Sequence, residues 1–339
     1  ALVRLVKLWE IGVMVLASIG FTTGNVPFQL AILFFLGVQS AFFGPVKYGI
    51  LPELLPAEEL MGGNALIEAG TFLAILIGTI AGGLLILAPH GLAVVSATML
   101  TIAVAGWAAS LWVPRTADAA TALRLNPNIV AETWRILRHV QERPELRWPI
   151  LGISWFWLVG AGYLSQFPNY AKDVLGADNE VVTLFLTVFS IGIGIGSLLC
   201  GRLQRGRIDA RLVPWGALGM TVFAFDLAFA GGGGHSGPLL GAFAFLATPA
   251  HWRIVFDLFA ISVSGGIFIV PLYVLMQRRS EEQHRARVIA ANNVMNALFM
   301  VATGVASALI LKAGYGVGGV FLALALGNVL VTAASFRRR

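Results

Sequence analysis

The sequence predicts an all-α membrane protein, and three observations support this fold class. They are the composition, the length of the apolar stretches and the placement of the basic residues. Hydrophobic residues make up 58% of the 339 residues, and charged residues make up only 12%. A soluble globular chain carries about 25% charged residues, so this composition suits a chain whose surface faces lipid.

Ten apolar stretches are long enough to be transmembrane helices, because about 20 helical residues cross the hydrocarbon core. The alternative, buried helices of a large soluble core, would need many amphipathic covering helices, and only one segment has that pattern. We therefore expect ten spans, near residues 5–23, 27–48, 63–88, 91–113, 149–169, 181–201, 213–232, 253–276, 288–311 and 315–336.

The basic residues predict how the spans are oriented. If the spans alternate and Ala1 is cytoplasmic, the cytoplasmic side holds every one of the 23 basic residues except Lys172, Arg253 and Lys312. Such an asymmetry is the positive-inside pattern of a multi-pass membrane protein. The net charge of +6 is explained by this orientation, so we expect no nucleic-acid partner.

A long polar stretch divides the chain into two halves. We expect an N-terminal bundle at 1–113, a cytoplasmic linker at 114–148 and a C-terminal six-helix bundle at 149–339. Within the linker, "NIVAETWRILRHVQ" (128–141) has an apolar stripe beside basic residues. This pattern suits a helix on the membrane surface or one that packs on the end of the bundle.

Three short echoes occur in the same order in the two halves. "RLVKLWEIG" (4–12) matches "RLVPWGALG" (211–219), "FFGPVKY" (42–48) matches "GIFIVPLY" (266–273), and "GGNALIE" (62–68) matches "AANNVMN" (290–296). Parallel repeats of this kind build a large class of transporters. Two spans precede the second copy of the first echo and none precedes the first copy, so we expect a whole protein of twelve helices.

Two stretches resemble the bacterial lysophospholipid transporter family of the major facilitator superfamily. They are "QSAFFGPVKYGILPELLPAEELMGGNALIEAGTFLAILIGTIAGGLL" (39–85) and "HRARVIAANNVMNALFMV" (284–301). The resemblance implies two pseudo-symmetric bundles that flip lysophospholipids, chiefly lysophosphatidylethanolamine, from the outer to the inner leaflet of the bacterial inner membrane. It also implies a partner, an acyltransferase–acyl carrier protein ligase, separate or fused. One departure is "GSLLCGRLQRGR" (196–207), which has Cys200 where an aspartate is common.

Ionisable residues inside spans are rare and are functional candidates. Lys47 lies near the cytoplasmic end of its predicted helix, where its ammonium would meet a phosphodiester or mark the membrane interface. Tyr48 beside it is a ligand contact or an interfacial anchor. Pro45 is expected to bend the helix end, and the echo Pro271–Tyr273 is expected at the matching place in the other half. We expect these ends to form an inner gate.

Two pairs of polar residues have helical spacing. Asn64 and Glu68 are four residues apart, as are Asn292 and Asn296, so each pair lies on one helical face. By analogy with the superfamily, their helices form the seams between the halves, through which a lipid would enter sideways. The two hypotheses are a gate or ligand role and simple interhelical hydrogen bonding.

Further candidates lie at the other side of the membrane. Asp226 and Asp257 are the candidates for ion coupling, with Asp226 as a proton or cation site. Asp257, one turn after Arg253, is also expected to form an i, i+4 ion pair with it, as a structural or gating salt bridge. The spacings Gly78–Gly82 and Gly192–Gly196 predict close helix packing.

No enzyme signature is visible, and we expect no metal, no cofactor and no catalytic residue. The five histidines are scattered, and "GIGIG" at residue 192 is embedded in an apolar span rather than following a strand. Two other functions stay open alongside lipid transport. One is export of drugs or small metabolites, and the other is a non-transporting membrane scaffold for an acyltransferase.

Overall fold

The computed structural model describes residues 2–114, 134–135, 138, 142–204, 210–231, 237–281 and 284–338. Most of the predicted linker and its amphipathic helix lie outside the described residues. The described residues form helices and one isolated bridge, between Ala177 and Leu240. In chain order the elements are α1 (Leu2–Thr23), α2 (Val26–Gly49), α3 (Leu51–Leu54), η1 (Ala57–Glu59), α4 (Leu60–Leu85), α5 (Gly91–Ser110), α7 (Pro144–Asn169), η2 (Tyr170–Val174), α8 (Asn179–Gln204), α9 (Val213–Ala230), α10 (Ala242–Ala247), α11 (His251–Arg279), α12 (Arg285–Lys312) and α13 (Gly316–Arg337).

Nine helical segments in the described part of the chain are long and apolar enough to cross a membrane, and each matches a predicted span. The remaining predicted span, near 5–23, is α1, a helix of 22 residues outside that set. Its charges are paired within the bundle: Lys7 donates to Glu10 at 2.7 Å, and Gln39 of α2 donates to the same carboxylate oxygen at 2.8 Å. The pairing lowers the cost of burying these charges.

Local sequence explains where the helices begin and turn. The side chain of Asn25 caps α2 by accepting from the backbone N–H of Phe28 at 3.0 Å, which satisfies one free donor of the first turn. Gly24 precedes this cap with a φ of +62°, a left-handed conformation that costs glycine little. The antiparallel hairpin of α1 and α2 therefore follows from the "GN" that joins them.

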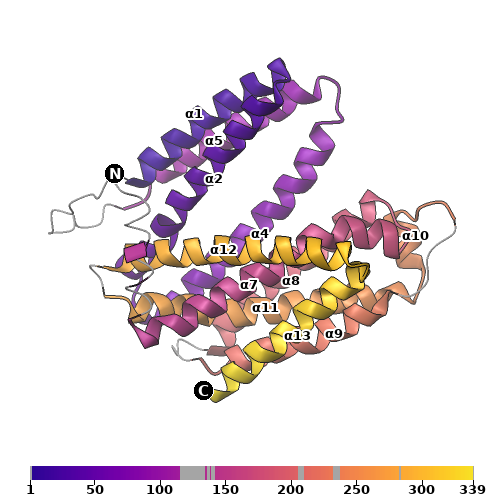
Figure 1. Ribbon diagram of the computed structural model, residues 1–339. Helices are drawn as coiled ribbons and strands as arrows, with labels where there is room; N and C mark the ends of the chain where they lie inside the picture. The colour runs from indigo at the N-terminus through magenta and orange to yellow at the C-terminus, as the bar shows by residue number, and fades with distance from the viewer. Residues whose placement is uncertain are drawn as a thin grey trace.

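The helices pack in two groups, as Figure 1 shows. Helices α2 and α5 both pack on α1, around a small core of Val13, Ala17 and Ile32. Helices α7, α8, α9, α11, α12 and α13 form the second group, whose much larger core centres on α11. Helix α4 continues the first group, where it touches α5, and packs mainly along α8 of the second group, so it carries the first group's side of the seam between the groups.

The two groups meet at one end of the molecule and diverge toward the other (Figure 1). We call the meeting end, which carries Arg4, Lys47 and Arg278, the basic end; the far end, which carries Arg253, is the opposite end. Helix α4 follows this divergence. Its buried residues lie between Leu60 and Leu76, and residues 77–85, nearer the opposite end, include none.

The glycine spacings behave differently in the two groups. A Cβ on Gly196 would collide with the backbone of Val263 in α11, and one on Gly192 with Ser262. These glycines therefore allow the close packing of α8 on α11, as predicted. A Cβ on Gly78 or Gly82 would meet no atom within 4 Å, so close packing is absent at this second spacing.

Candidate functional site

Two tyrosines from opposite groups stack at the basic end. Tyr48 of α2 and Tyr273 of α11 are 4% and 1% exposed, and their ring centroids lie 4.3 Å apart with an angle of 8° between the planes. Each helix has a proline just before its tyrosine: Pro45 lies three residues before Tyr48, and Pro271 lies two residues before Tyr273. The tyrosines that end the echoes at 42–48 and 266–273 thus stack on each other, ring face to ring face.

A buried carboxylate and a lysine lie beside the tyrosine stack. The hydroxyl of Tyr48 donates to Oε1 of Glu68, which is fully buried on α4. Within the described residues, Oε2 of Glu68 has no hydrogen-bond partner. Lys47 turns inward: its ammonium donates to Thr71 at 3.0 Å and lies 4.7 Å from the centre of the Tyr48 ring. Lys47 therefore contacts residues in the seam between the helix groups, whereas an interfacial anchor would extend its ammonium toward the membrane surface.

An amide pair closes the seam next to this cluster. Asn64 donates to Oε1 of Gln277 at 2.7 Å, and Gln277 donates back to Oδ1 of Asn64 at 2.9 Å. The same Gln277 amide donates to the backbone carbonyl of Tyr48 at 3.1 Å. Sequence reasoning missed Gln277, although a polar residue one turn after Tyr273 on the same helical face was a usable signal.

The second predicted pair, on α12, does not act as a pair. Asn296 accepts a hydrogen bond from Ser154 of α7 at 2.9 Å, a contact inside the second group. Asn292 is fully buried, and neither of its amide atoms has a hydrogen-bond partner among the described residues. It lies close to the Tyr273 hydroxyl, which itself accepts from Trp157 at 3.2 Å. Of the two, Asn292 faces the seam.

The acidic residues near the opposite end differ from expectation. Arg253 pairs with Asp226 of α9 through two hydrogen bonds of 2.8 and 2.5 Å, and the expected ion pair with Asp257 is not formed. The reason is geometric. The Arg253 guanidinium presents two parallel N–H groups that bind both carboxylate oxygens of Asp226, and such a two-point pair is strong. Asp226, which has no visible partner in the sequence, is therefore the residue that Arg253 neutralises.

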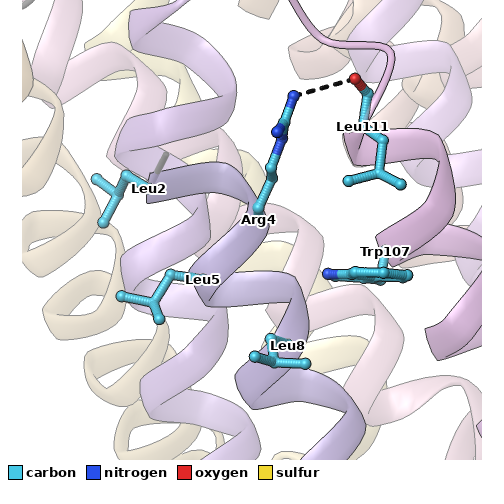
Figure 2. Close-up of a pocket in the computed structure, with 6 residues that line it drawn as sticks. All are labelled: Leu2, Arg4, Leu5, Leu8, Trp107 and Leu111. Carbon is cyan, nitrogen blue, oxygen red and sulfur yellow. Dashed lines mark hydrogen bonds between the residues drawn. The ribbon is translucent and has the colours of Figure 1, made fainter.

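A cavity of about 720 Å³ opens between the start of α1 and the end of α5. Figure 2 shows its six lining residues and the hydrogen bond from Arg4 to the carbonyl of Leu111, at 3.1 Å. The other lining side chains are apolar: Leu2, Leu5, Leu8 and Trp107. None of the predicted site residues lines this cavity, which lies away from the seam.

Comparison with known proteins assigns the family. The model of the Major Facilitator Superfamily matches residues 6–304. A protein of Citrobacter koseri named lysophospholipid transporter LplT is 31% identical, over 96% of this chain and 78% of that protein. The chain belongs to the major facilitator superfamily, and within it to the LplT family. The resemblance found in the sequence is confirmed.

Other relatives and solved structures agree with this superfamily membership. The LplT protein of Serratia proteamaculans is 33% identical over 76% of this chain, but the chain spans only 61% of that relative. The E. coli fucose:proton symporter FucP superposes with a TM-score of 0.70 at 14% identity, over 99% of this chain and 83% of the symporter. A bacterial homologue of the iron transporter ferroportin, in an outward-facing state, gives 0.67 at 16% identity, with the same coverage. These structures show the superfamily fold alone.

Proposed function

We propose that the protein is a secondary transporter that flips lysophospholipids, chiefly lysophosphatidylethanolamine, from the outer to the inner leaflet of the bacterial inner membrane. The observation that carries the proposal is the 31% identity to an LplT protein over 96% of this chain. The partner is an acyltransferase–acyl carrier protein ligase, which restores the second acyl chain on the cytoplasmic side.

The packing of the two groups fits the proposed direction of movement. With the basic end in the cytoplasm, the seam is closed inside and the helices diverge toward the outside. A lysolipid in the outer leaflet then reaches the diverging helices sideways, and its acyl chain stays in hydrocarbon. Leu73, Ile77 and Leu84 on the diverging part of α4 supply an apolar wall for that chain.

The polar groups of the seam supply separate functions in this proposal. Tyr48, Tyr273 and the Asn64–Gln277 amide pair form the inner gate, because each contact joins the two groups. Pro45 and Pro271 remove a backbone hydrogen bond near the gate, which weakens their helices against bending. The gate opens when the groups rock apart at the basic end, and the stack and the amide pair then separate together.

Lys47 is the phosphate-binding group in the proposal. Its ammonium is a compact charge on a flexible stem, and its present partner, the Thr71 hydroxyl at 3.0 Å, is neutral. A phosphodiester is a stronger acceptor, because charge-assisted hydrogen bonds are about twice as strong as neutral ones. Oε2 of Glu68 and the amide of Asn292 remain for the headgroup ammonium and the glycerol hydroxyl.

The test is leaflet-resolved transport of labelled lysophosphatidylethanolamine by the complete protein in proteoliposomes. Lys47→Ala is compared with Lys312→Ala, which removes an exposed lysine at the far end of α12. We expect transport to fall at least tenfold in Lys47→Ala and to stay unchanged in Lys312→Ala. Equal transport by both variants removes Lys47 from the site, and no transport by the wild-type protein ends the proposal.

Competition separates this proposal from the two other functions that the sequence leaves open. An exporter of drugs or small metabolites predicts that lysolipid headgroups do not compete with its substrate. A membrane scaffold for the acyltransferase predicts normal binding of the ligase with no lipid movement. The proposal requires that unlabelled lysolipid competes with labelled lysolipid.

A further inference from the structure

The cavity between the start of α1 and the end of α5 is apolar except for one cation. Five of its six lining side chains are apolar: Leu2, Leu5, Leu8, Trp107 and Leu111. The sixth is Arg4, which belongs to the first turn of α1 (Figure 2). The volume of about 720 Å³ falls within the range of about 300–1,000 Å³ that is usual for small-molecule sites. The combination predicts a ligand with an acidic head and an apolar tail.

Arg4 keeps most of its binding capacity for a ligand. Within the described residues its guanidinium donates to a neutral acceptor, the carbonyl of Leu111, at 3.1 Å. Lys7, one turn further along α1, is instead paired with Glu10 at 2.7 Å. A guanidinium presents five N–H donors, so the other donors of Arg4 remain for the oxygens of an anion.

The cavity lies at the depth of the lipid headgroups. Arg4 directly precedes the apolar span predicted at 5–23, at the end that the basic residues place in the cytoplasm. On α5, Trp112 follows Leu111 and is 87% exposed, and tryptophan is enriched where a helix leaves the hydrocarbon. The leucine wall from Leu2 to Leu8 runs about 9 Å along α1, at about 1.5 Å per residue. It therefore leads from the headgroup region into the hydrocarbon.

At the matching place in the C-terminal group, two aromatic side chains pack against each other. The repeat that pairs residues 4–12 with 211–219 puts Trp215 of α9 at the position of Leu8. Trp215 packs edge to face on Phe336 of α13, with ring centroids 5.7 Å apart, and α9 packs on α13 as α1 packs on α5. The cavity thus depends on the side chains of the N-terminal group and is not imposed by the fold.

We propose that this cavity binds an anionic phospholipid of the cytoplasmic leaflet, with the lipid phosphate on Arg4 and part of an acyl chain on the leucines. The guanidinium fork matches phosphate oxygens, and basic pockets between membrane helices on the cytoplasmic side bind acidic headgroups. Among the described residues, no acidic side chain lines the cavity. The ammonium of a zwitterionic lipid would therefore have no partner there, which favours a headgroup without a cation.

The proposed lipid has a structural role that is separate from transport. Its binding residues belong to α1 and α5, whereas the gate residues belong to α2, α4 and α11. The core of the N-terminal group is small, with three buried residues: Val13, Ala17 and Ile32. A lipid that bridges the start of α1 and the end of α5 adds apolar contact where the protein supplies little. The inference holds whether or not the protein flips lysolipids.

The test measures the unfolding temperature of the purified complete protein in a mild neutral detergent. Phosphatidylglycerol is titrated into the micelles, and phosphatidylcholine with the same acyl chains is the matched zwitterionic lipid. A ligand of the native state raises the unfolding temperature in a saturable way. We expect phosphatidylglycerol to reach half-saturation at a mole fraction at least tenfold lower than phosphatidylcholine.

Two variants test the two parts of the site. Arg4→Gln removes the charge, and we expect it to raise the half-saturating fraction of phosphatidylglycerol about tenfold without changing the response to phosphatidylcholine. Leu8→Trp copies the C-terminal group and fills the cavity, so it is expected to abolish the saturable response. The matched controls are Arg278→Gln, an exposed arginine at the basic end, and Ile19→Trp, a 47% exposed residue nearer the other end of α1. Both are expected to respond like the wild type.

Three outcomes overturn the proposal. One is that phosphatidylglycerol does not stabilise the wild-type protein; a lower unfolding temperature of Leu8→Trp would then show that a segment of the protein itself fills the cavity. The second is an equal effect of the two lipids on the wild type. The third is an unchanged response to phosphatidylglycerol in either Arg4→Gln or Leu8→Trp, and if one of them does not fold, the other decides. Lysolipid transport is not measured, so failure here leaves the proposed function standing.

Discussion

The seam cluster around Tyr48 and the cluster around Asp257 are both buried and polar, but their hydrogen bonding differs. At the seam, the Asn64 and Gln277 amides bind each other reciprocally, at 2.7 and 2.9 Å. Around Asp257 of α11, Oδ2 of Asp257 and the hydroxyls of Tyr163 and Tyr170 have no partner within the described residues, and at the seam Oε2 of Glu68 and the amide of Asn292 have none either. The seam contacts also join two helix groups, whereas Asp257 and its tyrosines belong to one. The amide bonds across the seam suit a gate, because rocking of the two groups breaks them together, whereas the contacts around Asp257 stay within one group.

A third cluster shows that the C-terminal group satisfies buried polar residues where they serve packing. Asn328 of α13 accepts from the indole N–H of Trp155 at 2.7 Å and donates to Thr221 at 2.8 Å and to the carbonyl of Ala217 at 2.9 Å. Every polar atom of the Asn328 side chain is thus used. The lone oxygens of the Asp257 cluster differ from this pattern, as do buried polar atoms of Ser197, Arg285 and Asn292 in the same bundle, which also have no hydrogen-bond partner within the described residues.

The comparison also predicts which contacts change when the protein moves. Rocking of two rigid groups separates contacts between them and preserves those within each. The Tyr48–Tyr273 stack therefore breaks when the basic end opens, while Asp257 keeps its neighbours Tyr163 and Tyr170. A covalent cross-link across the seam is therefore expected to prevent the first change and to leave the contacts around Asp257 as they are.

The largest expected effect comes from a disulfide across the seam. A Cβ on Gly201 of α8 would lie 3.7 Å from the Cβ of Ala65 on α4, close to the mean Cβ–Cβ separation of natural disulfides, about 3.8 Å. In a Cys200→Ala background, we expect Ala65→Cys with Gly201→Cys to abolish lysolipid transport under oxidation and to restore it on reduction. Transport is measured in proteoliposomes with each single cysteine variant as the control.

The same disulfide tests whether the basic end must open during transport. Full transport by the cross-linked protein would show that the basic end does not need to open.

The next effect comes from breaking the amide pair. Gln277→Leu leaves Oδ1 of the buried Asn64 and the Tyr48 carbonyl without the donor that Gln277 supplies, while the Asn64 nitrogen keeps its bond to the Leu60 carbonyl. An unsatisfied buried group costs about 1–3 kcal/mol. We expect the closed seam to be destabilised by that amount, which makes the basic end open about 5- to 150-fold more often. The measurement is the rate at which a membrane-impermeant thiol reagent, applied from the basic side, alkylates Ala65→Cys in a Cys200→Ala background.

A double variant distinguishes lost pairing from general damage. Asn64→Leu with Gln277→Leu replaces both partners by apolar groups, which is often nearly neutral. We expect its alkylation rate to lie closer to the wild type than that of either single variant. Strictly additive rates would show that the two amides act separately and that their hydrogen bonds do not hold the gate.

The fold was predictable because its signals are long. An apolar stretch of about 20 residues has few alternatives to a membrane helix, and each predicted span is a helix in the structure. The repeat predicts that Tyr48 and Tyr273 lie at the same end of matching helices, and in the structure their rings stack.

The polar partners were harder to predict, because they depend on which helix faces become neighbours. Asp257 lies one turn after Arg253, and this spacing predicts an i, i+4 ion pair. In the structure, α9 instead brings Asp226 to Arg253, and the two side chains form two hydrogen bonds. Tyr163 and Tyr170 gave no signal, since an aromatic residue in an apolar span is usually core. Their missing hydrogen bonds become visible only once the packing is known.

The smallest effect is expected at a polar contact that lies at the basic end but outside the seam. Arg143, just before α7, binds Glu281 after α11 at 2.7 Å, and His284 contacts the other carboxylate oxygen at 3.0 Å. The Arg143 hydrogen bond, followed by that of His284, holds the pKa of Glu281 below its usual value. Both partners belong to the C-terminal group, so this pair is not expected to affect the gate.

The sign of its pH dependence follows from the lowered pKa. A carboxyl group whose pKa is lower in the folded state adds stability above its unfolded pKa of about 4.3, and the gain is lost as the pH falls through the folded pKa. The unfolding temperature of Arg143→Gln is therefore expected to lie slightly below that of the wild type at pH 7, with the two converging as the pH falls through the lowered pKa of Glu281. The effect is small because the Glu281 side chain is 53% exposed and water screens the pair. In a Glu281→Gln background the Arg143→Gln difference should vanish, and a change in Ala65→Cys alkylation on Arg143→Gln would show that the pair belongs to the gate after all.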